Sequence, residues 1–223
     1  LEHLRESDVR TFRDKLLKAG RVPKTVNGYL KDVRNALRRA HVQGHIPRNV
    51  AAAVDLLDES GTPERQPLTL EDIKGLLEVA TPEWQGMILL GLYGGLRIRD
   101  CANLTHGQLD LQRASIIYRP QKTSRKRKDI TLPMHPRLLR FFVEYASADD
   151  PSAPVFPSLA GKVASDLSKG FADLLEAAGV ERGGEKTGGR MIYQKSFHSL
   201  RHACASFMAN AEVPEELRAR VTG

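Results

Sequence analysis

Most of this 223-residue chain repeats apolar residues every three or four positions, the spacing that gathers them on one face of an α-helix. The clearest run is Val26, Leu30, Val33, Leu37 and Ala40. Capping residues, glycines and prolines bound similar runs elsewhere in the chain. They predict further helices over 8–20, 49–57, 83–93, 135–146, 164–178 and 196–211, from Thr69 onward and after Pro214.

One stretch, from about 109 to 132, departs from this pattern. The segments 115–118 (Ser-Ile-Ile-Tyr) and 129–132 (Asp-Ile-Thr-Leu) are short and rich in β-branched residues, which is typical of strands. A basic turn joins them, so we expect an antiparallel hairpin. Residues 181–195 are Gly-rich and charged, and we expect a mobile loop there. The predicted fold class is mainly α with a small antiparallel hairpin or sheet (α+β).

The stretch 58–66 is polar, contains several helix breakers and shows no apolar periodicity, which is typical of a linker between domains. It separates a helical segment, residues 1–57, from a larger domain, residues 67–223. The two cysteines, Cys101 and Cys204, lie in predicted helices without metal-ligand spacing. We therefore expect them to be small core residues in a reducing compartment, and we expect no metal site.

Basic residues outnumber acidic ones by 34 to 27, a formal charge of +7 that favours a polyanionic partner. Two groups of basic residues stand out. One is the turn of the predicted hairpin, and the other is the polar face of the helix that contains Leu30. Both groups fit a solvated surface and a DNA-facing one equally well. Their members are Arg119, Lys122, Arg125, Lys126, Arg127 and Lys128 in the turn, and Lys24, Lys31, Arg34 and Arg38 on the helix. No apolar run approaches the roughly 18 residues that a membrane span needs.

The segment 196–202 (Ser-Phe-His-Ser-Leu-Arg-His) carries the strongest chemical signal. His198 and Arg201 are three residues apart, so on a helix both leave the same face. An imidazole can pass a proton while a guanidinium holds an oxyanion with two donors. Arg97, in Gly-Leu-Arg-Ile-Arg-Asp, would add a second guanidinium, an arrangement that suits a phosphoryl-transfer transition state. The alternatives are an Arg97 paired with Asp100 and a capping His198.

The order of these segments resembles that of the tyrosine recombinases, or phage-type integrases. Arg97 matches the family's first catalytic arginine, and Asp100 its acidic residue three positions later. Lys122 matches the lysine of the β-hairpin turn, with Lys126 and Lys128 as later rivals. Residues 198–202 (His-Ser-Leu-Arg-His) match the His-x-Leu-Arg-His box. The resemblance implies a helical core-binding domain, partial here, in residues 1–57 and a catalytic domain in residues 67–223.

The resemblance also implies a mechanism. A tyrosine would attack the scissile phosphate and form a 3′-phosphotyrosyl bond, with Arg97, Lys122, His198 and Arg201 as catalytic residues and no cofactor. All five tyrosines of this chain precede the box, whereas the family's nucleophile follows it. We therefore expect a fragment that stops before the final His or Trp and the Tyr, and that binds DNA without cleaving it. The residues expected to contact DNA are Arg119, Arg125, Lys126, Arg127, Lys128, Lys24 and Arg34.

The partner implied is double-stranded DNA. The full-length protein would act as a homotetramer on DNA, the fragment itself would be monomeric, and neither would involve a membrane. The expected location is the cytoplasm, at the nucleoid, of a prokaryote hosting a phage or mobile element. Two alternatives remain open: an inactive DNA-binding regulator of the same fold, and a type IB topoisomerase-like enzyme.

Overall fold

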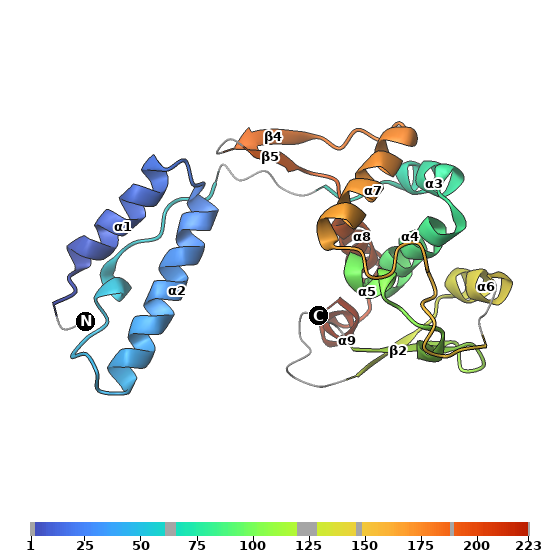
Figure 1. The fold of residues 1–223 in the computed structure, drawn as a ribbon, viewed down its shortest axis with the longest axis horizontal. Helices are drawn as coiled ribbons and strands as arrows, with labels where there is room; N and C mark the ends of the chain where they lie inside the picture. The colour runs from blue at the N-terminus through green and yellow to red at the C-terminus, as the bar shows by residue number, and fades with distance from the viewer. Residues whose placement is uncertain (1–2, 61–65, 120–128, 146–148, 188–189, 223) are drawn as a thin grey trace. The chain divides into compact units, whose positions relative to one another are not determined.

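The computed structural model describes residues 3–60, 66–119, 129–145, 149–187 and 190–222 (Figure 1). The chain forms two compact units. The first unit comprises Leu1–Glu64 with Gly184–Ile192, and the second comprises Arg65–Gly183 with Tyr193–Gly223. Each unit has its own hydrophobic core.

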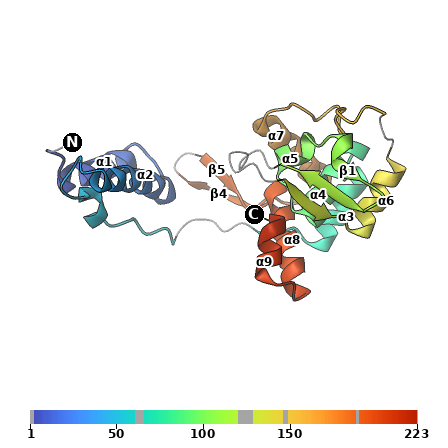
Figure 2. The same cartoon turned by 90° about the horizontal axis from the view of Figure 1, so that it is seen from below.

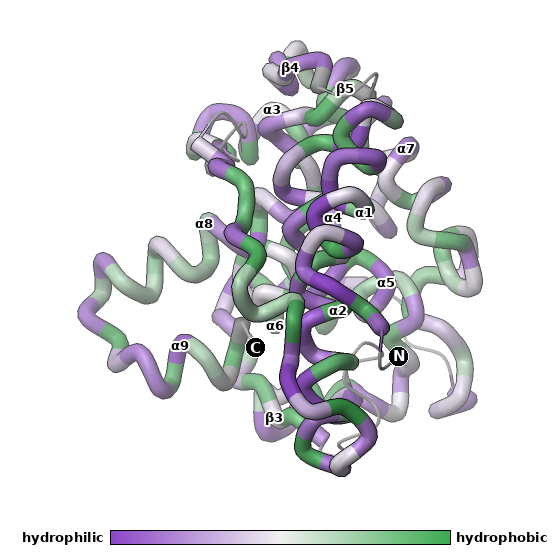
Figure 3. The backbone as a smooth tube through the Cα atoms, turned by 90° about the vertical axis from the view of Figure 1, so that its left-hand side faces the viewer, coloured by the Kyte–Doolittle hydropathy of each residue, from purple (hydrophilic) through white to green (hydrophobic). Residues whose placement is uncertain are grey.

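Two helices lie side by side in the first unit, α1 (Glu6–Lys18) and α2 (Pro23–Val42) (Figure 1). Along α1, polar and apolar residues alternate as the helix turns, which is visible in Figure 3. The apolar faces of both helices enclose a small core. Its buried members are Val9, Val26, Leu30, Leu37, Ile46, Ala51 and Val54.

The helix predicted over 49–57 is reduced to one 3₁₀ turn, η1 (Val50–Ala53), so that prediction is wrong in length and type. Side chains around the turn use its backbone groups. The Asn49 carboxamide oxygen accepts a hydrogen bond from the Ala51 amide at 3.1 Å, and Arg34 donates to the carbonyls of Ala51 and Val54. These contacts hold the carbonyls in the geometry of a single turn.

The second unit is built around α4 (Pro82–Gly94), which packs against neighbouring helices (Figure 1). These are α3 (Leu70–Val79), α5 (Ile98–Ala102), α6 (Pro136–Glu144) and α8 (Phe197–Asn210). A further helix, α7 (Ala164–Ala177), contacts α3 and α5. Most of α4 is buried, which explains its apolar composition all the way round. The helices predicted over 83–93, 135–146, 164–178 and 196–211 are confirmed.

Small residues let the neighbours of α4 approach closely. A Cβ on Gly91 would lie 3.1 Å from side-chain carbons of Leu200 and Phe197, so the glycine brings α8 close to α4. The position of α8 is therefore set by tight apolar packing.

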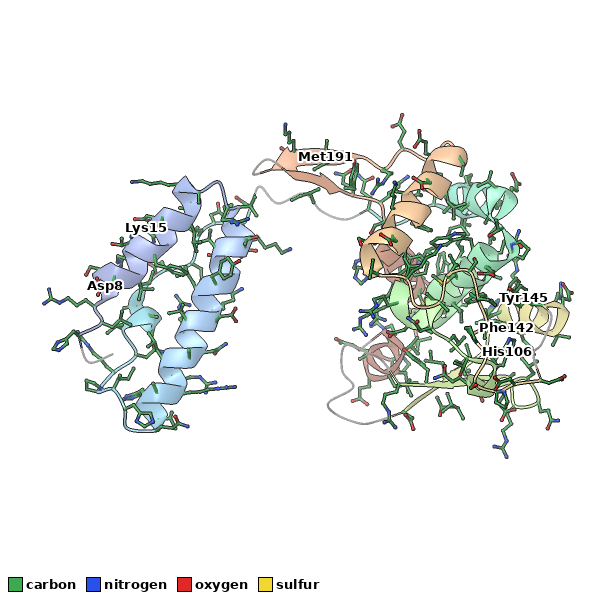
Figure 4. The ribbon with its side chains drawn as sticks, in the orientation of Figure 1. Asp8, Lys15, His106, Phe142, Tyr145 and Met191 are labelled. Atoms are coloured by element: carbon green, nitrogen blue, oxygen red, sulfur yellow. The ribbon has the colours of Figure 1, made fainter. Side chains whose placement is uncertain are left out.

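Aromatic side chains pack on and beside α6. Phe142 is buried, and Tyr145 just after the helix stacks with Phe141 at 5.2 Å between ring centroids (Figure 4 labels Phe142 and Tyr145).

A three-stranded antiparallel sheet contains β1 (Leu109–Asp110), β2 (Ser115–Tyr118) and β3 (Ile130–Pro133) in that order. In its register Ile116 lies opposite Leu132, and both are buried. The predicted strands are confirmed. The turn that joins β2 to β3, residues 120–128, lies outside the described residues.

The loop predicted over 181–195 is a β-hairpin, so that prediction is corrected. Strands β4 (Gly184–Thr187) and β5 (Arg190–Tyr193) form a two-stranded sheet. Met191 and Tyr193 are 47% and 43% exposed (Figure 4 labels Met191). The sequence therefore lacks the alternation of buried apolar and exposed polar residues that predicts a strand. Its glycines, read as loop residues, include Gly183, whose φ of +54° favours glycine.

The last helix, α9 (Glu215–Thr222), contacts α8, and α9 with the adjoining end of α8 projects from the body of the second unit (Figures 2 and 3). Throughout the described ranges, each helix is too short or too polar to cross a membrane.

Candidate active site

Arg97 stands at a turn that the sequence forces on the backbone. Helix α4 ends at Gly94 and is capped by Gly95, whose φ of +59° is in the left-handed region that glycine adopts readily. Leu96 is fully buried and anchors the turn in the core. Arg97 then precedes the first residue of α5, and 31% of its side chain is exposed. The guanidinium is therefore carried by a rigid backbone while it still reaches solvent.

Arg201 reaches the same turn from α8, although it lies far away in the sequence. Its residue exposure is only 7%, and its Nη1 donates a hydrogen bond to the carbonyl oxygen of Gly95. The neighbouring Leu200 is fully buried against α4. Packing of α8 on α4 thus brings Arg201 into contact with Gly95, two positions before Arg97.

The two guanidiniums influence each other electrostatically. Burial, and next the positive charge of Arg97, lower the pKa of Arg201. A nearby carboxylate offsets part of this repulsion, because Asp100 Oδ2 lies 4.0 Å from Arg97 Nη1 and the Asp100 side chain is almost fully buried. Two positive charges share one negative charge, so an anion bound here would gain from both guanidiniums.

Tyr118, at the end of β2, belongs to the same cluster and was not singled out from the sequence. Burial, and next the negative charge of Asp100, raise the pKa of its hydroxyl to about 12, while Arg201 and Arg97 oppose the increase. The residue is 4% exposed. Its place at the strand end, just before the basic turn, is the one sequence signal that was available.

His198 lies on α8, one turn before Arg201, and is exposed. Its ring meets that of His202 edge to face, with centroids 4.7 Å apart. The structure thus places Arg97, Asp100 and Arg201 together and puts His198 on the solvent side of the same helix that carries Arg201. An exposed imidazole can exchange protons with solvent, as general acid–base chemistry requires.

The residues expected to bind DNA fall into three situations. Four of them lie outside the described residues, namely Arg125, Lys126, Arg127 and Lys128. The same holds for Lys122, which was expected to be catalytic. Arg119 is exposed, and its Nε donates to Asp129 Oδ1 at 2.8 Å, which joins the two strands just before the turn. This hydrogen bond raises the pKa of Arg119.

In the first unit, Lys24 is exposed on α2, as a DNA-contacting residue would be. Arg34 differs, because its guanidinium already donates to the carbonyls of Ala51 and Val54. Its role is at least partly structural, a feature that the helical face could not reveal.

The two cysteines are buried, which confirms them as core residues. Burial raises the pKa of the Cys204 thiol to about 11, so it stays protonated near neutral pH. Within the part of the chain that the structure describes, three or more His, Cys, Asp or Glu side chains never gather as a metal site would require.

Comparison with known proteins supplies the family. The model of the phage integrase family matches residues 66–222. Among solved structures, the Tn1549 transposon integrase in complex with a circular intermediate DNA has a TM-score of 0.74 at 19% identity, covering 100% of this chain and 78% of that one. A lambda integrase dimer bound to a core site has a TM-score of 0.68 at 15% identity, covering 100% and 80%.

A lambda integrase tetramer bound to a Holliday junction has a TM-score of 0.67 at 16% identity, covering 99% of this chain and 64% of that one. The comparison with curated proteins finds no match. At these identities the structural likenesses show a shared fold. The family model covers well over half of the chain, and the chain therefore belongs to the phage integrase family, the tyrosine recombinases.

Proposed function

We propose that this chain serves site-specific DNA recombination, in which Arg97 and Arg201 hold the scissile phosphate. The observation that carries the proposal is the guanidinium pair itself. Arg97, just before α5, lies 4.0 Å from the buried carboxylate of Asp100, and burial together with the charge of Arg97 lowers the pKa of Arg201 on α8. A phosphodiester in the transition state gathers negative charge on its non-bridging oxygens, which such a pair would stabilise without a metal ion.

In the proposed reaction a tyrosine hydroxyl attacks phosphorus, the bond to the 5′ oxygen breaks, and a 3′-phosphotyrosyl bond forms. The proton lost by the tyrosine would pass with the help of His198, which is exposed on α8. Lys122, a prediction outside the described residues, would protonate the departing 5′ oxygen. The energy of the phosphodiester is kept in the covalent bond, so rejoining needs no nucleotide cofactor.

The wider roles are proposed on the same basis. Residues 1–57 would be part of a core-binding domain, residues 58–66 a linker and residues 67–223 a catalytic domain. Exposed Lys24 and Arg119, with the basic turn after Arg119, would contact backbone phosphates. A tetramer on a Holliday junction, the state solved for lambda integrase, would be the working assembly of the full-length protein. Its place of action would be the cytoplasm of a prokaryote.

Binding of orthovanadate, a phosphate analogue, tests the anion site directly. We expect it to shift the arginine Nε–Hε NMR signals of Arg97 and Arg201 in the wild-type chain. Arg201→Gln should lose the response, Arg201→Lys should keep part of it, and Arg119→Gln, an exposed control, should leave it unchanged. The proposal fails if the wild-type chain shows no response or if Arg201→Gln matches it.

A second candidate function is a DNA-binding regulator of the same fold, because exposed basic residues such as Lys24 and Arg119 would serve DNA binding without cleavage equally well. A DNA substrate that traps covalent intermediates distinguishes the two functions when it is applied to the product of the whole gene: an adduct supports the recombinase, and DNA binding without an adduct supports the regulator. Relaxation of supercoiled plasmid without site-specific joining would instead indicate a type IB topoisomerase-like enzyme.

A further inference from the structure

The short segment before α8, Tyr193–Ser196, is fastened to separate parts of the second unit. The amide of Gln66 donates to the carbonyl of Gln194 at 3.2 Å. The amide of Lys195 donates to the carbonyl of Arg182 at 2.9 Å. The Lys195 side chain reaches the start of α3, where its Nζ lies 2.8 Å from Asp72 Oδ2. Three contacts with residues distant in sequence thus meet where the chain enters α8.

The ion pair between Lys195 and Asp72 is well built for a structural restraint. Their side chains are only 16% and 15% exposed, so solvent screens the pair less than it screens a surface pair. The same Asp72 oxygen accepts the Thr69 amide at 2.9 Å, and the Asp72 amide donates to Thr69 Oγ1 at 3.1 Å. Asp72 is therefore fixed by the capping box of α3 before it binds Lys195.

The pKa of Asp72 agrees with this geometry. Burial raises it, but the hydrogen bonds from Lys195 and the Thr69 amide outweigh burial, and the net pKa lies below the ordinary value. The carboxylate is charged at neutral pH and holds Lys195 as a charged partner.

The restraint acts on the residues of the candidate active site. At the start of α8 the Ser196 amide donates to the Ser199 hydroxyl at 3.2 Å, and His198 follows Lys195 by three positions. Phe197 is buried against Phe171, and the exposed His198 beside it meets the ring of His202 on the same helix. The direction of its ring therefore depends on how the first turn of α8 is held.

We propose that Lys195 is a positioning residue: through Asp72 it fixes the first turn of α8 and so aims His198, together with Arg201, at the phosphate. This inference rests on the proposed function, because it assigns the ion pair to the same phosphate site. It adds an element outside the His-Ser-Leu-Arg-His box, namely a contact between the residue before the helix cap and the N-terminus of α3.

Three substitutions isolate the ion pair. Lys195→Met removes the ammonium and keeps the length of the side chain. Asp72→Asn removes the charge and keeps an oxygen that can accept from Thr69. Lys195→Arg keeps a cation that can pair with Asp72, so it should behave like the wild-type chain where Lys195→Met does not. Lys169→Met changes an exposed lysine of α7 and serves as the control.

The first readout is local and needs no ligand. Amide hydrogen exchange should become about tenfold faster at residues 200–203, whose helical hydrogen bonds end in the first turn of α8. Amides of α4 should keep their wild-type rates, which shows that the fold persists. The pH titration of the His198 imidazole signal should shift in Lys195→Met and Asp72→Asn. The titration of His198 in Lys195→Arg and in Lys169→Met should match that of the wild-type chain.

The second readout is orthovanadate affinity, expected to fall severalfold in Lys195→Met and Asp72→Asn and to recover in Lys195→Arg. The double variant should lose little more than either single variant, because both remove one interaction. Unchanged exchange and an unchanged His198 titration in Lys195→Met overturn the proposal. So does unchanged vanadate affinity when the wild-type chain binds vanadate. A wild-type chain that binds no vanadate instead contradicts the proposed function itself.

Discussion

The basic side chains of this protein fall into two groups that the structure treats differently. Arg201 is buried and donates to the carbonyl of Gly95, and Arg97 follows the fully buried Leu96 with 31% of its own side chain exposed. Lys24 and Arg119 are exposed on the surfaces of their units. A buried, anchored guanidinium is already oriented when an anion arrives, whereas an exposed one must be ordered on binding. The comparison teaches that net charge favours attraction to DNA, while a fixed position in the fold distinguishes the arginines suited to holding the reacting phosphate.

The sharpest way to break this comparison is to replace Arg201 in a cleavage-competent form of the protein. Arg201→Gln should lower the rate of strand cleavage about 10²- to 10³-fold, the usual cost of removing one preorganised donor to a transition state. Arg119→Gln should lower that rate by less than about tenfold. Single-turnover cleavage at saturating protein gives both numbers. Equal losses would mean that burial does not separate the two groups.

The pH dependence of folding stability tests whether the hydroxyl of Tyr118 lies in the buried charged cluster. Its folded pKa of about 12 lies above the ordinary value near 10, so the unfolded chain ionises first as pH rises. The stabilisation is fully present below pH 10 and should be lost between about pH 10 and 12, by about 2 kcal/mol in all.

Urea unfolding across this range measures the loss, and phenolate absorbance should show Tyr118 as a late-titrating tyrosine. Tyr118→Phe should remove that part of the pH dependence. An identical decline in the wild-type chain and in Tyr118→Phe would show that the hydroxyl does not lie in the charged cluster.

Gly91 tests whether the arginine pair depends on helix packing. A methyl group there would lie 3.1 Å from Leu200 and Phe197, so Gly91→Ala should force α8 away from α4 and cost about 1–3 kcal/mol of unfolding free energy. Vanadate binding should weaken as well, since Arg201 lies on α8. Gly28→Ala is the control, because nothing lies within 4 Å of a Cβ on that glycine of α2. It should leave stability unchanged or raise it by up to about 1 kcal/mol.

The smallest effect is expected when an exposed basic residue, Arg119, is replaced and equilibrium binding of duplex DNA is measured. Arg119→Gln should weaken duplex DNA binding modestly and lower the salt slope of the binding constant by about one, as the loss of one phosphate contact does. Stability should stay close to that of the wild-type chain, because the ion pair with Asp129 is exposed and screened by solvent. Fluorescence anisotropy at several salt concentrations measures the slope. An unchanged slope would remove Arg119 from the DNA-contacting residues.

Local signals allowed much of the fold to be predicted. Thr69 was expected to cap a helix and does so through a capping box with Asp72. The helix predicted over 83–93 is observed as Pro82–Gly94, and the next residue, Gly95, is left-handed and ends it. Each of these rests on interactions within about four residues, which a single sequence displays directly.

Predictions that failed or fell short involved partners distant in sequence. Arg34 was assigned to DNA from its helical face, yet it donates to carbonyls of the next segment. The β4–β5 hairpin was read as a loop, because neither strand shows the apolar alternation of a half-buried sheet. Tyr118 was not singled out, because its environment depends on a carboxylate from α5 and an arginine from α8.

The sequence by itself determined the helical class, the short hairpin strands, the caps and the order of the arginine and histidine motifs. These follow from periodicity, backbone preferences and motif spacing, all of which act along the chain. Only the tertiary structure decided that Arg201 meets the turn before Arg97 and that Lys195 binds Asp72. Such pairs form because packing of α8 against α4, and of the chain around α3, brings distant residues together, and no local pattern encodes that distance.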